Sequence, residues 1–267
     1  MIRLADLHET LVEIRGDEAR SWLNGQLTCN VHALPPGGSM RGLRLTKNGR
    51  ILAVVRVLDR PDGLDLLVPR DRAEELVADL DRYIIMEDVE LHPRFEERAY
   101  ALLGEGHAQE GTIPGELFGQ PVSFATSPDL DAACARHGAT RLTDDELETL
   151  RIEAGEPGAA ELSRGLLPQE AGLKALVSFT KGCYLGQEPV VMLEHRGRAP
   201  KRLARFRTAE PTHAGAPLTL PSGEAIGEIT SAAGPFALAL VPRRAEEEPS
   251  LFVDGKRALE WRFVDAG

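Results

Sequence analysis

The sequence's clearest folding signal is the Asn-Gly pair at positions 48 and 49. Two strand-like runs, residues 39–46 and 51–58, flank the tetrapeptide Lys-Asn-Gly-Arg at 47–50. Asn and Gly readily adopt positive φ at both central positions of a two-residue turn. The pattern therefore predicts an antiparallel hairpin.

Hydrophobic periodicity elsewhere predicts an α+β fold with helices between short strands. Further strands are expected at 10–14, 64–68, 84–91, 100–103, 121–125 and 139–142. Helices are expected from Asp17 onward and at 71–83, 129–136 and 144–154. After Pro200 the sequence consists of brief runs in which apolar and polar residues alternate, and these predict a small C-terminal β-barrel. Those runs are residues 202–207, 217–220, 225–231, 236–241 and 251–264.

Length and charge narrow the class of protein. With 267 residues the chain exceeds a typical single domain, so two or more units are expected. Its formal net charge of −11 argues against a generally cationic binder of nucleic acid or lipid headgroups. Charged residues interrupt the N-terminus, and the longest apolar runs are far shorter than the roughly 20 residues that span a bilayer. We therefore expect a cytoplasmic protein with no membrane partner.

Cysteine usage and motif searches exclude several chemistries. Cys29, Cys134 and Cys183 are an odd number without close spacing, so no disulfide framework and no metal site are predicted. The phosphate-binding loop, the GxGxxG turn, HExxH and the GxSxG elbow are all absent from the sequence.

The most informative segment is Lys-Gly-Cys-Tyr-Leu-Gly-Gln-Glu at 181–188. A helix is expected to begin near Gln187, with Glu188 in its first turn, where a negative charge suits the helix dipole. Cys183 would then lie just before a helix N-terminus and near Lys181, which favours thiolate and makes it the candidate reactive sulfur. The alternative is that Cys183 is a small buried hydrophobe, as free cysteines often are.

Charge is also unevenly distributed around this segment. Residues 181–207 carry seven basic and two acidic side chains, a net charge of +5 in an acidic protein. This basic island suits an anionic small molecule or partner, or is simply a solvated face.

Glu153 lies upstream, near the C-terminal end of the helix expected at 144–154. A negative charge there is unfavourable to the helix dipole, whereas the positive charge of nearby Arg151 is favourable. Glu153 is either held for a ligand, whose paired N–H groups it would accept, or solvated.

Taken together, the motifs resemble the folate-binding YgfZ-type proteins, which are relatives of the aminomethyltransferase T-protein of the glycine cleavage system. The resemblance rests on LRIEAG (150–155), LPQEAGL (167–173), KGCYLGQE (181–188) and HRG (195–197), supported by GQLT (25–28) and NGR (48–50). It implies a ring of mixed α/β subdomains around a central pocket, over residues 1–197, followed by a C-terminal β-barrel over residues 198–267. It also implies tetrahydrofolate or a one-carbon derivative as ligand. Iron–sulfur client or assembly proteins are the implied partners, in a role that supports tRNA modification.

Carried over to this chain, the resemblance assigns the reactive position to Cys183. The motif residues are Lys181, Gly182, Cys183, Tyr184, Gly186, Gln187 and Glu188. The folate-binding candidates are Arg151, Glu153, Tyr184 and Arg196. Met192 stands where many relatives have an arginine, so a gripping role there is in doubt, and Arg196 is the candidate substitute.

Three function classes follow. A folate-binding protein that is not a conventional enzyme is preferred. If the chain is an enzyme, a folate-dependent aminomethyltransferase is expected. That reaction needs a proton-handling carboxylate, and the stretch after the Asn-Gly turn has no acid before Asp59. The third class, an RNA-binding module, conflicts with the net acidity.

Overall fold

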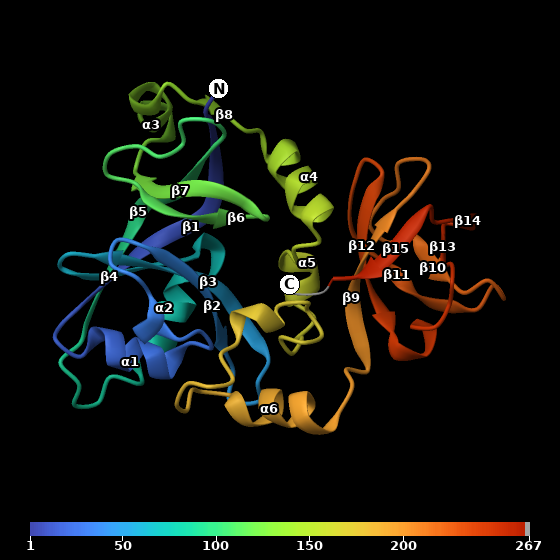
Figure 1. Ribbon diagram of the computed structural model, residues 1–267, viewed down its shortest axis with the longest axis horizontal. Helices are drawn as coiled ribbons and strands as arrows, with labels where there is room; N and C mark the ends of the chain where they lie inside the picture. Colours follow the sequence, from blue (N-terminus) through green and yellow to red (C-terminus); the bar gives the residue numbers. More distant parts are fainter. Residues whose placement is uncertain (265–267) are drawn as a thin grey trace. The chain divides into compact units, whose positions relative to one another are not determined.

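The computed structural model describes residues 1–264 and confirms a mixed α+β fold of two sheets and few helices (Figure 1). The chain forms two compact units. The first comprises Met1–Thr46, Leu52–Thr143 and Leu176–Leu185, and the second comprises Lys47–Ile51, Asp144–Ala175 and the residues from Gly186 onward. The predicted domain boundary, between residues 197 and 198, lies inside the second unit, just before its sheet.

Within the described residues, the first unit contains an eight-stranded sheet in the order β2-β3-β4-β1-β5-β7-β6, with β8 paired to β1. Its strands are β1 (Arg3–Arg15), β2 (Ser39–Leu45), β3 (Ile51–Arg60), β4 (Gly63–Pro69), β5 (Glu90–Leu103), β6 (Ile113–Leu117), β7 (Gln120–Ser127) and β8 (Thr140–Arg141). Its helices are α1 (Ala19–Gln26), η1 (Val31–Ala33), η2 (Arg70–Arg72), α2 (Ala73–Asp81) and α3 (Leu130–His137). The predicted hairpin is confirmed as β2 and β3, which are neighbours in the sheet.

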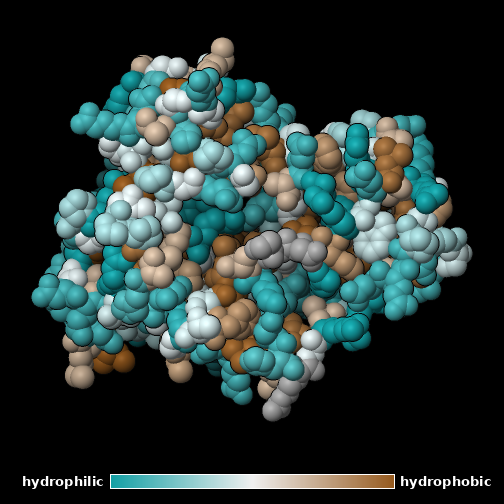
Figure 2. All heavy atoms as spheres, viewed as in Figure 1, coloured by the Kyte–Doolittle hydropathy of each residue, from teal (hydrophilic) through white to brown (hydrophobic). Residues whose placement is uncertain are grey.

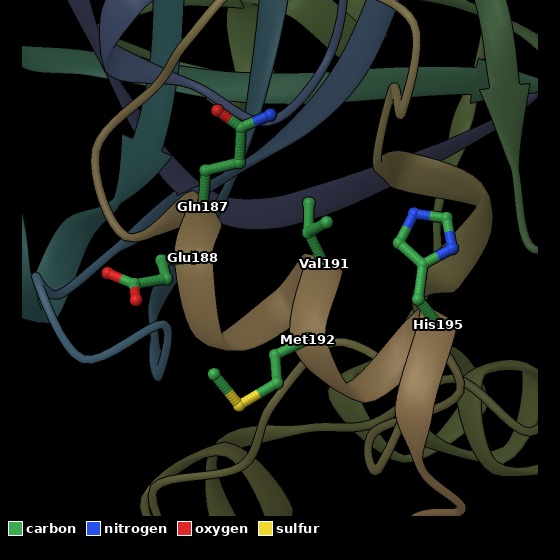
Figure 3. A pocket seen from close by; sticks show the side chains of 5 residues that line it. All are labelled: Gln187, Glu188, Val191, Met192 and His195. Carbon is green, nitrogen blue, oxygen red and sulfur yellow. The ribbon is translucent and has the colours of Figure 1, made fainter.

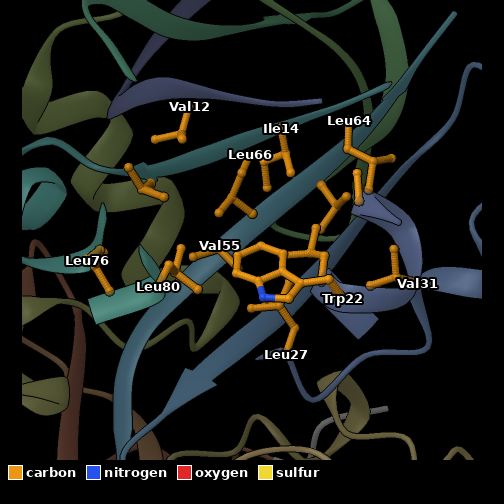
Figure 4. Close-up of a cluster of buried hydrophobic side chains, with 14 of the residues drawn as sticks. Val12, Ile14, Trp22, Leu27, Val31, Val55, Leu64, Leu66, Leu76 and Leu80 are labelled. Atoms are coloured by element: carbon orange, nitrogen blue, oxygen red, sulfur yellow. The ribbon is translucent and has the colours of Figure 1, made fainter. Parts of the chain in front are cut away.

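The main core of this unit forms where α1 and α2 pack against β1, β3 and β4 (Figure 4). Trp22 of α1 is central to it, and its indole nitrogen donates a hydrogen bond to the Tyr83 carbonyl at 2.9 Å. Val12, Val55 and Leu66 from the three strands are all at most 1% exposed. The alternating strand pattern and the helical spacing of Leu76 and Leu80 therefore meet in one apolar cluster.

One predicted strand is wrong over most of its length. Residues 84–89 form a loop, and β5 begins only at Glu90. The Glu87 carboxylate accepts the N–H groups of Ile85 and Met86 at 2.9 and 3.0 Å. Because these amides bond locally, they cannot take part in a strand ladder. Ile85 and Met86 are 82% and 91% exposed, so the apolar run that suggested a strand lies in solvent.

The strand β6 has no counterpart in the sequence predictions. It pairs with β7 across a turn at Phe118 and Gly119, whose φ values are 53° and 77°. Two successive positive φ values belong to the tight hairpin turns that usually contain Asn, Asp or Gly. Phenylalanine at the first position hides that signal.

The second unit contains a curled sheet of seven strands in the described part of the chain, in the order β14-β13-β10-β11-β12-β9-β15. These are β9 (Lys201–Arg207), β10 (Pro217–Thr219), β11 (Ala225–Ala233), β12 (Phe236–Pro242), β13 (Phe252–Val253), β14 (Lys256–Arg257) and β15 (Glu260–Phe263). Its helices are α4 (Asp144–Ala154), α5 (Ala159–Leu162), α6 (Gln187–Arg196) and η4 (Arg243–Ala245); η3 (Lys174–Leu176) spans the unit boundary. The short alternating runs after Pro200 thus form the predicted C-terminal β structure.

Helix α4 packs on this second sheet through one fully buried residue. Ile152 is 0% exposed and contacts Leu203 of β9 and Leu238 of β12. The helix has the predicted bounds and ends at Gly155, whose φ of +82° is easily adopted by glycine. The end of the LRIEAG motif is therefore fixed against the sheet.

The viewed face of the molecule is dominated by hydrophilic side chains, as the composition leads one to expect (Figure 2). None of the helices in residues 1–264 combines the length and the apolar composition needed to cross a lipid bilayer.

The cap of α3 provides a test of the local structure. The Asp129 carboxylate accepts the N–H groups of Asp131 and Ala132 at 2.9 and 3.2 Å. Asp129→Ala should lower the free energy of unfolding by about 1 kcal/mol, because it leaves two helix amides without an acceptor. Urea denaturation measures this loss. Asp131→Ala, which removes only a first-turn charge, should cost less; equal losses would contradict the capping role.

Candidate functional site

The C-terminal end of α1 has carbonyl groups that need hydrogen-bond donors from outside the helix. The last carbonyl groups of an α-helix have no partner within the helix. The last turn of α1 contains no basic residue, and Leu27, which follows it, is extended. The carbonyls around the GQLT segment therefore need donors from elsewhere in the chain.

Most of those donors come from residues 178–185, called here the motif segment because it contains the first five residues of KGCYLGQE. The Lys181 ammonium donates to the carbonyls of Asn24, Leu27 and Cys29, the last two at 2.5 and 2.8 Å. The Leu185 N–H donates to the Gly25 carbonyl at 3.2 Å. The loop is thus attached to the end of α1 near both of its ends.

Burial shifts the pKa values of Lys181 and of the neighbouring Cys29. Desolvation lowers the pKa of Lys181 to about 8, although the nearby Cys29 opposes this shift. Burial raises the pKa of the Cys29 thiol to about 11, so Cys29 is a neutral thiol at physiological pH. The Lys181 ammonium also lies 5.0 Å from the centroid of the Tyr184 ring, a distance at which cation and ring attract.

Tyr184 is buried without a hydrogen bond for its hydroxyl. The residue is 6% exposed, and its oxygen has no partner among the residues that the structure describes. Burial raises the pKa of this phenol to about 12. The hydroxyl is therefore a protonated, unused donor at physiological pH.

Cys183 lies on the same loop and is exposed. The alternative interpretation, that it is a small buried hydrophobe, is therefore wrong. Cys29 is buried and Cys134 is partly buried, so Cys183 has the most accessible thiol of the three. In the described residues no group of three or more histidine, cysteine, aspartate or glutamate side chains is arranged to hold a metal ion.

The rest of the motif begins α6, one side of which is hollowed. Gly186 has a φ of +78° and precedes the helix. Five side chains of α6 line a hollow of about 660 Å³: Gln187, Glu188, Val191, Met192 and His195 (Figure 3). This volume is within the range of small-molecule sites. Met192 is 51% exposed, and the side chain of Arg196 lies outside the described part of the chain.

Two other motifs secure the start of α6 within the second unit. A Cβ atom on Gly49, whose φ is +74°, would lie 3.1 Å from the Gly186 carbonyl oxygen, so the Asn-Gly turn packs closely against this helix. Arg50 forms an ion pair with Glu170 at 2.9 Å, and Gln169 donates to the Val190 carbonyl at 2.8 Å. NGR, LPQEAGL and the second half of KGCYLGQE therefore form one cluster.

Arg151 is occupied by protein groups. Its side chain is 12% exposed and pairs with Glu148 at 2.5 Å and Glu161 at 3.6 Å. Glu161 is fully buried and also accepts hydrogen bonds from the Gly158 N–H and the Ser231 hydroxyl, both at 2.7 Å. Glu153 is exposed at the end of α4. The folate-binding roles assigned to Arg151 and Glu153 stay predictions.

Comparisons with known proteins support the resemblance. No family model matches the chain. The tRNA-modifying protein YgfZ of Photobacterium profundum is 26% identical over 225 residues, which cover 76% of this chain and 68% of that protein. The protein of the same name from Edwardsiella ictaluri is 28% identical over 233 residues, covering 73% and 68%. The predicted resemblance to the YgfZ-type proteins is confirmed. The chain matches about two thirds of the length of these YgfZ proteins.

The fold of this YgfZ-like chain is that of the T-protein. The glycine cleavage system aminomethyltransferase T from Bartonella henselae superimposes with a TM-score of 0.81 at 19% identity, covering 96% of this chain and 83% of that one. At this identity the likeness establishes a shared fold.

Sequence reasoning missed two parts of the site. It did not single out Val191 and named His195 only as part of the HRG motif, although residues 187, 191 and 195 recur at the spacing of one helix face. It also did not connect GQLT with Lys181, because no local pattern reveals a hydrogen bond between residues more than 150 positions apart.

Tyr184 and Tyr100 form a matched pair for testing the unused hydroxyl. Tyr184→Phe should leave the free energy of unfolding unchanged or raise it by about 1 kcal/mol, because it removes a buried group without a partner. The Tyr100 hydroxyl contacts the His137 ring nitrogen at 2.9 Å, so Tyr100→Phe should lower that free energy by about 1 kcal/mol. Urea denaturation compares the two. Equal losses would show that the Tyr184 hydroxyl has a bonding partner.

Proposed function

We propose that this YgfZ-like chain binds tetrahydrofolate or a one-carbon derivative along α6 and uses Cys183 to support the assembly or repair of iron–sulfur enzymes. One observation carries the proposal: the exposed Cys183 thiol lies on an anchored loop that leads directly into a helix with a hollowed face. We further propose a cytoplasmic location and a role upstream of tRNA modification. The names of the YgfZ relatives support that link.

The lining of the hollow suits a reduced pterin with an amide-bearing tail. The Glu188 carboxylate can accept paired N–H groups, as a 2-amino pyrimidine ring presents them. Gln187 and His195 offer further donors and acceptors, whereas Val191 and Met192 provide apolar contact. Such a mixture of apolar wall and few polar groups is typical of small-molecule sites.

Aminomethyl transfer is the weaker alternative. The strand β3 carries no acid before Asp59. The Asp59 carboxylate is bound to the Arg20 guanidinium and accepts the Gly37 N–H at 2.8 Å, so it acts as a structural acceptor. A carboxylate held in this way is poorly suited to exchanging protons with a substrate.

Side chains of the basic island contact other groups of the second unit. Arg205 donates to the Glu153 carbonyl, and the Arg202 guanidinium lies 4.3 Å from the centroid of the Phe263 ring. These contacts favour a structural use of two of the arginines over phosphate binding, and so they do not favour the RNA-binding alternative.

A direct titration tests the ligand. Anaerobic calorimetry with tetrahydrofolate should show saturable binding, and Gln187→Ala and His195→Ala should each raise the Kd about tenfold, since a lost hydrogen bond of about 1.4 kcal/mol has that effect. Lys256→Ala is the control, because Lys256 is an exposed residue of β14. Absence of folate binding, or equal affinity in all variants, would refute the assignment to α6.

A cellular assay tests the thiol. Cys183→Ala should retain folate affinity and stability, because the side chain is exposed, but should fail to restore iron–sulfur enzyme activity to cells that lack the protein. Cys134→Ala is the matched control and should restore it. Full restoration by Cys183→Ala would remove the thiol from the proposed function.

A further inference from the structure

We infer that Lys181 is a positioning residue, whose ammonium closes the C-terminal end of α1 and thereby holds in place the loop that carries Cys183. The inference rests on hydrogen bonds within the first unit and goes beyond the proposed function. It also departs from the sequence-based hypothesis that Lys181 favours thiolate at Cys183.

The donors at this helix end account for seven consecutive carbonyls. Leu23 is bonded within α1, through the Leu27 N–H, and Gln26 accepts from Arg44. The motif segment serves the other five carbonyls: Lys181 serves Asn24, Leu27 and Cys29, Leu185 serves Gly25, and Ser178 serves Thr28. Without this segment, these five carbonyl groups in and just after the last turn of α1 would have no hydrogen-bond donor among the residues that the structure describes.

The three bonds of Lys181 use its full capacity. An ammonium group has three N–H donors and no acceptor, and here three carbonyl oxygens take all three. No donor is left for a ligand or for the Cys183 sulfur. A positive charge at this point also complements the negative end of the α1 dipole, which has no basic residue of its own in its last turn.

The same bonds explain how the loop presents its thiol. Lys181 and Leu185 attach residues 181–185 to α1 at both ends, and Cys183 lies midway between the two attachments. The Tyr184 ring is buried beside the ammonium, whereas Cys183 is exposed. A short loop fixed at both ends restricts where its central side chain can lie. Cys183 is therefore accessible and positioned at the same time.

Amine labelling of the unaltered protein gives the first test. A lysine with a pKa of about 8 and a free amine would react with an acylating ester faster than an ordinary surface lysine. We expect the opposite at pH 8: Lys181 should be acylated at least tenfold more slowly than the exposed Lys256, as read from peptide masses. Acylation of Lys181 as fast as that of Lys256 would overturn the inference.

Lys181→Met gives the second test, with Lys256→Met as control. It removes the ammonium but keeps a side chain of similar length. Hydrogen exchange of the amides at 25–29 and 182–185 should accelerate at least tenfold in Lys181→Met and remain unchanged in the control. The pH dependence of Cys183 alkylation is the second measurement, because a nearby ammonium charge could act on the thiol without a hydrogen bond to it.

The outcomes separate positioning from activation. A rise of one pH unit or more in the alkylation midpoint, with unchanged hydrogen exchange, would show that Lys181 acts on the thiol by its charge and would overturn the inference. If Lys181→Met does not fold, the labelling of the unaltered protein still decides. Neither test uses folate, so failure here is distinguishable from failure of the folate titration.

Discussion

The candidate site depends on one constraint: the carbonyl groups at the end of α1 have no hydrogen-bond partner within the helix. Carbonyl groups buried without donors are costly, and this helix end has no basic residue nearby in sequence. The chain satisfies them with a lysine and two amides from the segment 178–185. The loop that carries the exposed thiol therefore has its conformation because α1 ends where it does.

A second set of contacts performs the same task for the other half of the motif. In the second unit, the turn at Gly49 packs against Gly186, and the side chains of Gln169 and Glu170 hold the start of α6 and the adjoining turn. KGCYLGQE is thus divided: residues 181–185 belong to the first compact unit, and residues 186–188 belong to the second. One half presents a thiol, and the other begins a helix with a hollowed face.

This division gives each polar group of the motif a distinct chemical character. Lys181 is saturated by carbonyl oxygens, and Tyr184 keeps an unused hydroxyl donor. Gln187 and Glu188 line a hollow large enough for a small molecule. Cys183 has an exposed thiol. In the proposed function, ligand contact, positioning and thiol chemistry therefore belong to different residues within eight consecutive positions.

Local sequence signals predicted the elements whose physics is local. The hairpin followed from Asn48 and Gly49, and the start of α6 from the residues around Gln187. Such signals failed where a side chain overrode them. Glu87 accepts two amides from the first part of the strand expected at 84–91, and Phe118 occupies a turn position usually taken by Asn or Gly. Short motifs in the sequence carried the resemblance to the YgfZ-type proteins, and relatives of that name are 26–28% identical to the chain.

The sequence by itself determined the fold class, the relatives and the candidate thiol, because turn residues, helix periodicity and a dense polar motif are all encoded within a few positions. Only the tertiary structure decided that Cys183 is exposed, that Lys181 serves carbonyls instead of a ligand or the thiol, and that Val191 and His195 share a hollow with Gln187. Burial and hydrogen-bond saturation depend on groups more than 150 residues away in the chain, and no local pattern records which donor will meet which carbonyl.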